Sequence, residues 1–154
     1  MTRKCAECGK PMAHRGYMHE EKVGKNSVTD ATAFAWQCPG CGEVDMTLDE
    51  LAGYQRRAAA IVLREAKDIE GAVKYARKAI GMKQSELAER LGVATETLSR
   101  YETGAAEVPP GVRLAIVAVL EGVENAGGLE AYLEQSHARS THTFEVAPRR
   151  CACA

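Results

Sequence analysis

Residues 84–104 have the sequence QSELAERLGVATETLSRYETG, and this stretch decides the fold of the larger half of the chain. Apolar residues recur with helical spacing on both sides of Gly92, which predicts short helices over 84–91 and 95–102. Gly92 allows a sharp turn between them, and Gly104 ends the second helix. The side chains expected to share one small core are Leu87, Ala88, Leu91, Val93, Leu98 and Tyr101.

The opposite face of the second helix is polar and can meet DNA. Together with one residue at the start of the first helix, the candidate DNA-binding residues are Gln84, Thr95, Glu96, Thr97, Ser99 and Arg100. The guanidinium of Arg100 can donate two hydrogen bonds to O6 and N7 of a guanine, whereas Glu96 can accept from a cytosine amino group. Gln84 is expected to anchor a phosphate. The alternative is an ordinary helical hairpin in which Arg100 pairs with Glu96 on the surface.

Two copies of a cysteine motif lie near the N-terminus. They are Cys5-Ala6-Glu7-Cys8-Gly9 and Cys38-Pro39-Gly40-Cys41-Gly42. Two residues separate the cysteines of each pair, so four thiolates can surround one tetrahedral ion, and this predicts a single structural zinc. Gly9 and Gly42 are expected to supply the positive φ that such turns need. Disulfides, an iron–sulfur cluster and a thioredoxin-like redox motif are the weaker alternatives.

The two motifs together resemble a known family. Gln84, Ala88, Gly92-Val93 and the segment 98–104 closely resemble the helix-turn-helix of phage-repressor-like (Xre/Cro) regulators. Joined to the doubled Cys-x-x-Cys-Gly, they resemble the YgiT/MqsA group of zinc-finger plus helix-turn-helix proteins, over about residues 4–120. The resemblance implies that residues 1–46 bind a ribonuclease toxin, while the second domain dimerises and represses the operon.

The sequence departs from that family in its recognition helix. Family members contact bases with an Asn and an Arg four residues apart, and here those positions hold Glu96 and Arg100. The operator of the family therefore does not carry over to this chain. Lys83 and Ala94 also stand where helix caps are usual, and a missing cap costs about 1 kcal/mol.

The expected fold is a small zinc-bound α+β N-terminal module followed by an all-α Xre/Cro-type helix-turn-helix domain. Its parts are a four-cysteine module at 1–46, a connecting helix at 47–67, a DNA-binding and dimerisation domain at 68–137, and a flexible tail at 138–154. Thr47 and Glu50 form a capping box for the connecting helix, and Asp68 can cap a helix that ends near Ile80. Further helices are expected at 112–120 and 129–135.

Short strands are expected within 26–36, which is rich in Val, Thr and aromatic residues. Alternation places Val28, Asp30, Thr32, Phe34 and Trp36 on one face, although a carboxylate fits a buried face badly. His14 and His19 are expected to be loop histidines rather than metal ligands. Dimerisation is assigned to an apolar face of the 112–120 helix made by Val112, Ile116, Val119 and Leu120, whose alternative role is to close the monomer core.

Composition limits the possible functions. The chain has 154 residues, 45% hydrophobic and 27% charged, with a net charge of −1. Residues 51–80 hold seven Lys and Arg against three Asp and Glu, whereas residues 81–137 hold four against nine. Any attraction for phosphate must therefore come from a local patch. Six cysteines without a secretory signal or a long apolar run indicate a cytoplasmic, metal-binding protein that does not cross a membrane.

Three functions remain open at this point. The first is a repressor and antitoxin that binds a double-stranded DNA operator as a homodimer. The second is a stand-alone regulator of the same build, with no toxin partner. The third, an enzyme, ranks last because four protein ligands close the metal site and no catalytic constellation accompanies it.

Overall fold

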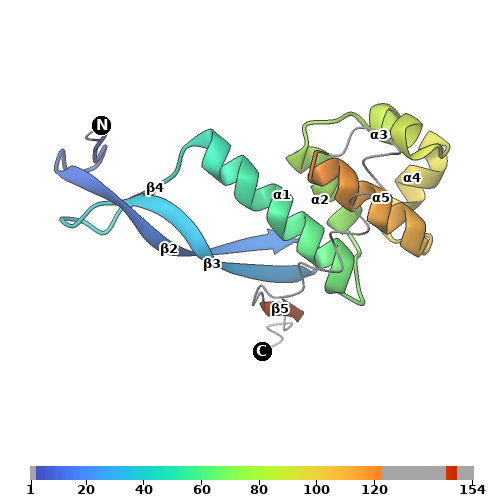
Figure 1. Ribbon diagram of the computed structural model, residues 1–154, viewed down its shortest axis with the longest axis horizontal. Helices are drawn as coiled ribbons and strands as arrows, with labels where there is room; N and C mark the ends of the chain where they lie inside the picture. Colours follow the sequence, from blue (N-terminus) through green and yellow to red (C-terminus); the bar gives the residue numbers. More distant parts are fainter. Residues whose placement is uncertain (1–2, 123–144, 149–154) are drawn as a thin grey trace.

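A computed structural model describes residues 3–122 and 145–148, and it places the cysteine loops at one end of the molecule and most of the helices at the other (Figure 1). The strands are β1 (Arg3–Lys4), β2 (Pro11–Val23), β3 (Asn26–Gln37), β4 (Val44–Asp45) and β5 (Glu145–Pro148). The helices are α1 (Leu48–Glu65), α2 (Ala72–Ala79), α3 (Gln84–Leu91), α4 (Thr95–Thr103) and α5 (Pro110–Leu120). This confirms the predicted fold class, an N-terminal β-rich module followed by helices.

The sheet is antiparallel with the order β1-β2-β3-β4, and β5 pairs with β3. Its centre is the long β2–β3 hairpin, in which His19 pairs with Asp30 but Tyr17 pairs with Ala33. The partner strand therefore carries one extra residue opposite Met18, which is a β-bulge. The hairpin runs beside α1 from the cysteine loops to the helical end (Figure 1).

The bulge reverses which residues of β3 are buried. Asn26, Val28 and Asp30 are buried before it, and Ala33 and Ala35 are buried after it. The prediction that Thr32, Phe34 and Trp36 share the face of Val28 and Asp30 is therefore wrong, because an extra residue shifts the two-residue alternation by one. The hydroxyl and backbone N–H of Thr32 donate to the Asp30 carboxylate at 2.7 and 2.8 Å, which fixes the bulge.

Helix α1 begins at the predicted capping box and lies against the hairpin. The Thr47 hydroxyl accepts from the Glu50 N–H, and the Glu50 carboxylate accepts from the Thr47 N–H. Farther along the helix, the Tyr54 hydroxyl accepts from the Phe34 N–H at 2.6 Å and donates to the Phe34 carbonyl at 2.9 Å. The helix thus takes the place that another strand would take at this point of β3.

Asp30 is buried because α1 supplies its counter-charge. Arg57 donates to the Asp30 carboxylate at 2.8 Å and stacks over the Tyr54 ring, 4.6 Å from its centroid. Burial alone would raise the pKa of Asp30, but the hydrogen bonds from Arg57 and Thr32 outweigh it and hold that pKa below its ordinary value.

The connection from α1 to α2 differs from the prediction. Helix α2 starts at Ala72 after Gly71, whose φ is 78°, and not at Asp68. Asp68 instead accepts from the Glu70 N–H and so stabilises a turn. Arg113 of α5 donates to the carbonyls of Leu63 and Ala66, so its guanidinium satisfies the C-terminal end of α1.

Helices α3, α4 and α5 confirm the predicted elements within two residues. Leu87, Ala88 and Leu98 are buried as expected, and Leu91, Val93 and Tyr101 pack partly buried against the same core. Gly92 and Gly104 have φ of 64° and 74°, the left-handed conformation predicted for the ends of α3 and α4. None of the helices in the described residues is long and apolar enough to cross a membrane.

The tip of the β2–β3 hairpin belongs to the helical core. Val23 and Val28 are fully buried in one cluster with Leu87, Leu98 and Ile116. Beside them, the backbone of Gly24 lies against Gly71, the Asn26 side chain donates to the Asp68 carbonyl, and the Tyr75 hydroxyl donates to Glu21. The boundary predicted at residue 46 therefore does not separate two independent cores.

Two expectations about the C-terminal part need correction. Glu145–Pro148 is not loose tail but the strand β5, antiparallel to β3 at Asn26–Thr29. Ile116 and Leu120 are buried in the core of the single chain, so their assignment to a dimer interface is wrong, whereas Val112 and Val119 are half-buried. The helix predicted at 129–135, and Cys151 and Cys153, lie outside the described residues.

Candidate metal centre and DNA-binding surface

The two cysteine loops have the same backbone conformation. In the first, the Cys5 N–H donates to the Lys10 carbonyl and the Gly9 N–H donates to the Cys5 carbonyl. The second repeats this pattern with Cys38, Glu43 and Gly42. Gly9 and Gly42 have φ of 72° and 79°, as predicted. Each loop is therefore a tight knuckle that presents two sulfurs in the same way.

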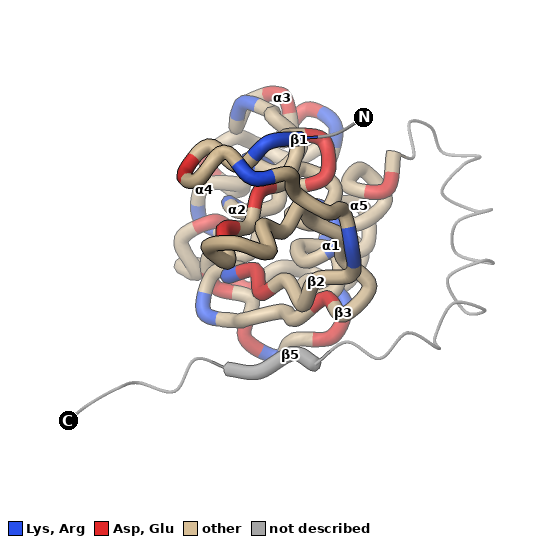
Figure 2. Tube along the Cα trace, turned by 90° about the vertical axis from the view of Figure 1, so that its left-hand side faces the viewer, with Lys and Arg blue, Asp and Glu red and all other residues tan. Residues whose placement is uncertain are grey.

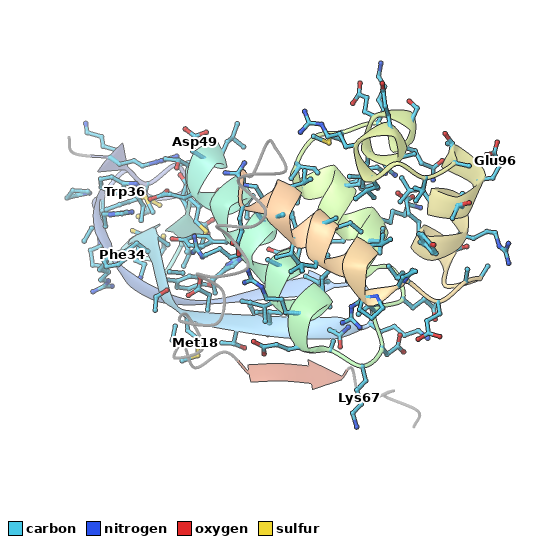
Figure 3. The ribbon with its side chains drawn as sticks, turned by 45° about the vertical axis from the view of Figure 1, so that its right-hand side comes forward. Met18, Phe34, Trp36, Asp49, Lys67 and Glu96 are labelled. Carbon is cyan, nitrogen blue, oxygen red and sulfur yellow. The ribbon has the colours of Figure 1, made fainter. Side chains whose placement is uncertain are left out.

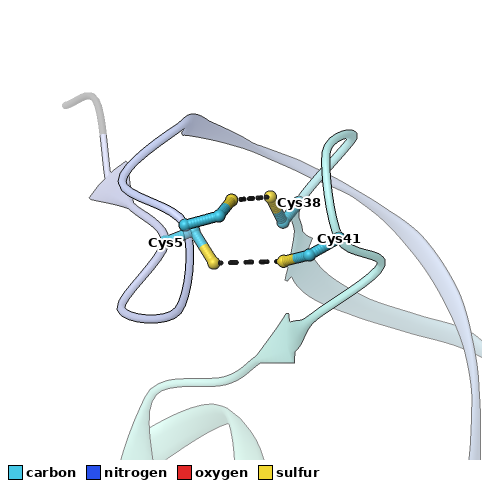
Figure 4. A group of neighbouring side chains, drawn as sticks. Cys5, Cys38 and Cys41 are labelled. Atoms are coloured by element: carbon cyan, nitrogen blue, oxygen red, sulfur yellow. Dashed lines mark hydrogen bonds between the residues drawn. The ribbon is translucent and has the colours of Figure 1, made fainter.

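The knuckles bring all four predicted ligands to one point (Figure 4). The Sγ atoms of Cys5 and Cys41 are 3.5 Å apart, those of Cys8 and Cys38 are 3.4 Å apart, and all four lie within 4.8 Å of one another. A tetrahedral ion with sulfurs at about 2.3 Å separates them by about 3.8 Å, so this arrangement fits such an ion closely. Four cysteines here can bind a metal ion.

The backbone favours a thiolate at this site. The N–H groups of Cys41 and Gly40 point at the Cys38 sulfur and lower the pKa of that thiol to about 6. The Glu43 N–H acts in the same direction on Cys41, but the neighbouring thiols Cys5 and Cys38 outweigh it and raise the pKa of Cys41 to about 12. Four sulfurs cannot all be charged at such short distances without a cation between them, so the cluster matches a metal site.

The histidines of the hairpin do not join this cluster. The His14 ring forms a hydrogen bond with Glu50 at 2.6 Å, and its centroid lies 5.7 Å from that of Phe34 and 5.0 Å from that of Trp36. His19 bonds Glu21 at 3.0 Å. Both lie on strand β2 rather than in loops, but neither supplies a ligand to the four-sulfur cluster, as expected.

At the other end of the molecule, α4 presents the predicted base-contacting residues. Thr95, Glu96 and Arg100 are exposed, whereas Thr97 and Ser99 are half-buried. Glu96 points outward from the end of the molecule opposite Trp36 and Phe34 (Figure 3). Among the described residues, the side chains of Glu96 and Arg100 form no ion pair with each other. Their charges are therefore available to a ligand.

A buried ion pair behind α4 was missed by the sequence analysis. Arg77 of α2 donates two hydrogen bonds to the Glu102 carboxylate, at 2.6 and 3.1 Å, and a third to the Met82 carbonyl. Glu102 is 5% exposed. Burial favours the neutral form of Arg77, but the bond to Glu102 dominates and raises the pKa of Arg77. The only sequence signal was a glutamate on the otherwise apolar side of the recognition helix.

Gln84 belongs to this network. Its side-chain N–H donates to Glu102 at 3.1 Å. The three side chains therefore link the start of α3, at Gln84, to the C-terminal turns of α4 and α2, at Glu102 and Arg77. The network fixes α4 relative to its neighbours, because removing Arg77 or Glu102 leaves the other charge largely buried and without its counter-charge. The phosphate contact expected of Gln84 stays a prediction.

Charge is mixed over the rest of the surface. Lys and Arg alternate with Asp and Glu along the chain in the view of Figure 2, which agrees with the small net charge. A DNA contact in this protein must therefore rely on particular side chains rather than on a strongly basic face.

A helix-turn-helix whose second helix has an exposed polar face is typical of DNA-binding regulators, and in this chain it accompanies a four-cysteine cluster that can bind a metal ion. Residues 73–121 match the family model HTH_3, described as helix-turn-helix, and this segment is an Xre-type helix-turn-helix domain. The match begins in α2 and ends just after α5, so it covers the four helices around the Arg77–Glu102 pair. No curated protein matches the chain.

Proposed function

We propose that the protein is a sequence-specific transcriptional repressor that binds a double-stranded DNA operator as a homodimer, in the cytoplasm and without enzymatic activity. The observation that carries this proposal is a pair of exposed charges, Glu96 and Arg100, that have no ion-pair partner within residues 3–122 and 145–148. They lie on a helix held by the buried Arg77–Glu102 pair. A rigid helix with free polar side chains suits the major groove.

The base contact is tested with Arg100→Ala. Arg90→Ala is the control, because it removes an exposed arginine of α3 that is not among the candidate DNA-binding residues. Binding is measured to a duplex that carries the DNA upstream of the gene and to a scrambled duplex, at one salt concentration. Arg100→Ala should cost about 1–3 kcal/mol on the upstream duplex and little on the scrambled one. An unchanged ratio between the two duplexes contradicts the role of Arg100.

We also propose that the metal is a single structural zinc. Four thiolates and no other ligand fit zinc, which supplies cross-linking but no open coordination position. Purified protein should contain about one zinc per chain. A stoichiometry far below one, or an iron content with sulfide, contradicts the assignment.

The resemblance to the YgiT/MqsA group supports a more specific role as an antitoxin whose metal-bearing end binds a ribonuclease toxin. An exposed aromatic cluster favours a protein partner there, since Phe34 is 50% exposed and stacks on His14 next to Trp36. This cluster lies far from Glu96, so DNA and a protein partner need not compete directly (Figure 3).

The toxin proposal is tested with the product of the neighbouring reading frame. Phe34→Ala should weaken binding of that product at least tenfold if the aromatic cluster is the contact. Leu48→Ala is the matched control, because Leu48 is also exposed but does not belong to the cluster. If the neighbouring product does not bind, the chain is a stand-alone regulator of the same build.

A further inference from the structure

The hairpin tip of the metal-bearing module reaches the DNA-binding side of the helical domain. A hollow of about 530 Å³ lies between them. Its lining includes Gly24 and Lys25 of the tip, the acidic Glu70, Lys74 of α2, and Gln84, Ser99 and Thr103 of α3 and α4. Gln84 and Ser99 are candidate DNA-binding residues identified from the sequence. The hollow is therefore continuous with the proposed DNA surface.

The two lysines of this hollow have different surroundings. Lys74 is exposed and forms no ion pair within the described residues. Lys25 pairs with Glu70 and lies 3.6 Å from Asp68, and these contacts raise its pKa. Glu102 also borders the hollow, but Arg77 neutralises it. Lys74 thus contributes a positive charge that no described carboxylate neutralises. The ammonium group of Lys25 can contact a phosphate while it remains paired with Glu70.

The hairpin tip is fixed against the helical domain by close packing. A Cβ atom on Gly24 would lie 2.2 Å from the Glu70 carbonyl oxygen, so the two backbones are in direct contact. Val23 and Val28 on either side of the tip are buried in the helical core. Lys25 is therefore held beside α4 in the same rigid body.

We propose that Lys74 and Lys25 bind the phosphate backbone of DNA beside the recognition helix, so that the metal-bearing module contributes directly to operator binding. This inference rests on the proposed function, because it assumes that α4 lies in the major groove. Contacts to phosphate act on every sequence alike, in contrast to the base contact assigned to Arg100.

The experiment measures the binding constant of the full-length protein for the upstream duplex and for a scrambled duplex over a range of salt concentrations. Each phosphate contact contributes a slope of about −0.9 to the plot of log K against log salt. Lys74→Gln and Lys25→Gln should each make the slope less negative by about that amount and should weaken binding to both duplexes by a similar factor. Lys67→Gln is the control, because Lys67 is an exposed charge that lines a separate hollow on the other side of Glu70 (Figure 3).

A variant of opposite sign makes the test independent of lost stability. Glu70→Gln removes the acid that pairs with Lys25 and should strengthen binding to both duplexes. An unchanged slope in Lys74→Gln, or an equal change in Lys67→Gln, overturns the inference. If the wild-type protein binds neither duplex, it is the proposed function that fails, and the two failures are thus distinguishable.

Discussion

The two ends of the molecule are held together by different forces. At the metal end, the buried cluster contains only Cys5, Met12 and Cys38, with Trp36 half-buried against it. At the helical end, a continuous aliphatic core includes Leu63, Leu87, Leu98 and Ile116, all essentially inaccessible to water. One chain therefore combines an end with a very small core, where four cysteines meet, with a conventionally packed end, and the β2–β3 hairpin and α1 join them.

The zinc ion proposed above accounts for this difference in core size. Burying a large aliphatic side chain contributes about 1.5–3 kcal/mol, so three small buried residues cannot order the two knuckles. A structural zinc contributes about 10–16 kcal/mol in small zinc-finger peptides. The metal end should accordingly respond to loss of the metal, and the helical end to changes in packing and buried charge.

Loss of a ligand should separate the two ends most clearly. In Cys38→Ser we expect the zinc content to fall from about one per chain to near zero, because three thiolates hold zinc far more weakly. Hydrogen exchange should lose protection over β1, β4 and the start of β2, while the hairpin tip and the helices keep theirs. Cys151→Ser, outside the described residues, is the control. If Cys38→Ser retains about one zinc per chain, Cys38 is not a zinc ligand and the proposed difference between the two ends is contradicted.

Breaking the buried ion pair should have the converse effect. Glu102→Gln leaves Arg77 charged and without its carboxylate, which should lower the free energy of unfolding of the helical end by about 3 kcal/mol. Urea unfolding followed by circular dichroism measures this change, and the zinc content should stay the same. Glu89→Gln changes an exposed glutamate of α3 and should have little effect. Equal stability of the two variants contradicts the role of the pair.

The link between the ends is tested at Gly24. Gly24→Ala forces a Cβ atom against the Glu70 carbonyl at a φ of 58°, and we expect a loss of about 1–3 kcal/mol. Hydrogen exchange should then show the tip opening before either end does. Gly16→Ala in the same hairpin is the control, since no atom lies within 4 Å of its added Cβ. If both variants behave alike, the hairpin tip does not join the two ends.

The smallest change in unfolding free energy is expected at Asp30, where Arg57 of α1 forms an ion pair with the hairpin. Its pKa is lowered in the folded state, so the carboxylate stabilises the fold above its unfolded pKa of about 3.9 and loses that effect as the pH falls through the folded value. Asp30→Asn should cost about 1 kcal/mol at neutral pH. The difference in unfolding free energy from wild type should shrink below pH of about 4. A difference that stays constant down to pH of about 3 contradicts this account.

The sequence predicted the four-cysteine cluster and the helix-turn-helix because both depend on local spacing. Two Cys-x-x-Cys-Gly repeats define their own turns, and the glycines after α3 and α4 mark the helix ends. The β3 bulge escaped prediction because an extra residue shifts the alternation without changing composition. The Arg77–Glu102 pair escaped it because the two side chains meet only when α2 and α4 pack together, and the docking of the hairpin tip at Gly24 is likewise a long-range contact.

The hydroxyl of Tyr54 has a consequence for solubility. A strand edge with free N–H and carbonyl groups is a template for pairing with another molecule, and such pairing leads to aggregation. Tyr54 occupies both groups of Phe34 at an exposed stretch of β3 that carries an aromatic side chain. Tyr54→Phe would free this edge, and the expected result is a protein that folds but self-associates with increasing concentration. The phenolic oxygen of Tyr54 thus prevents this edge of β3 from pairing with β3 of a second molecule.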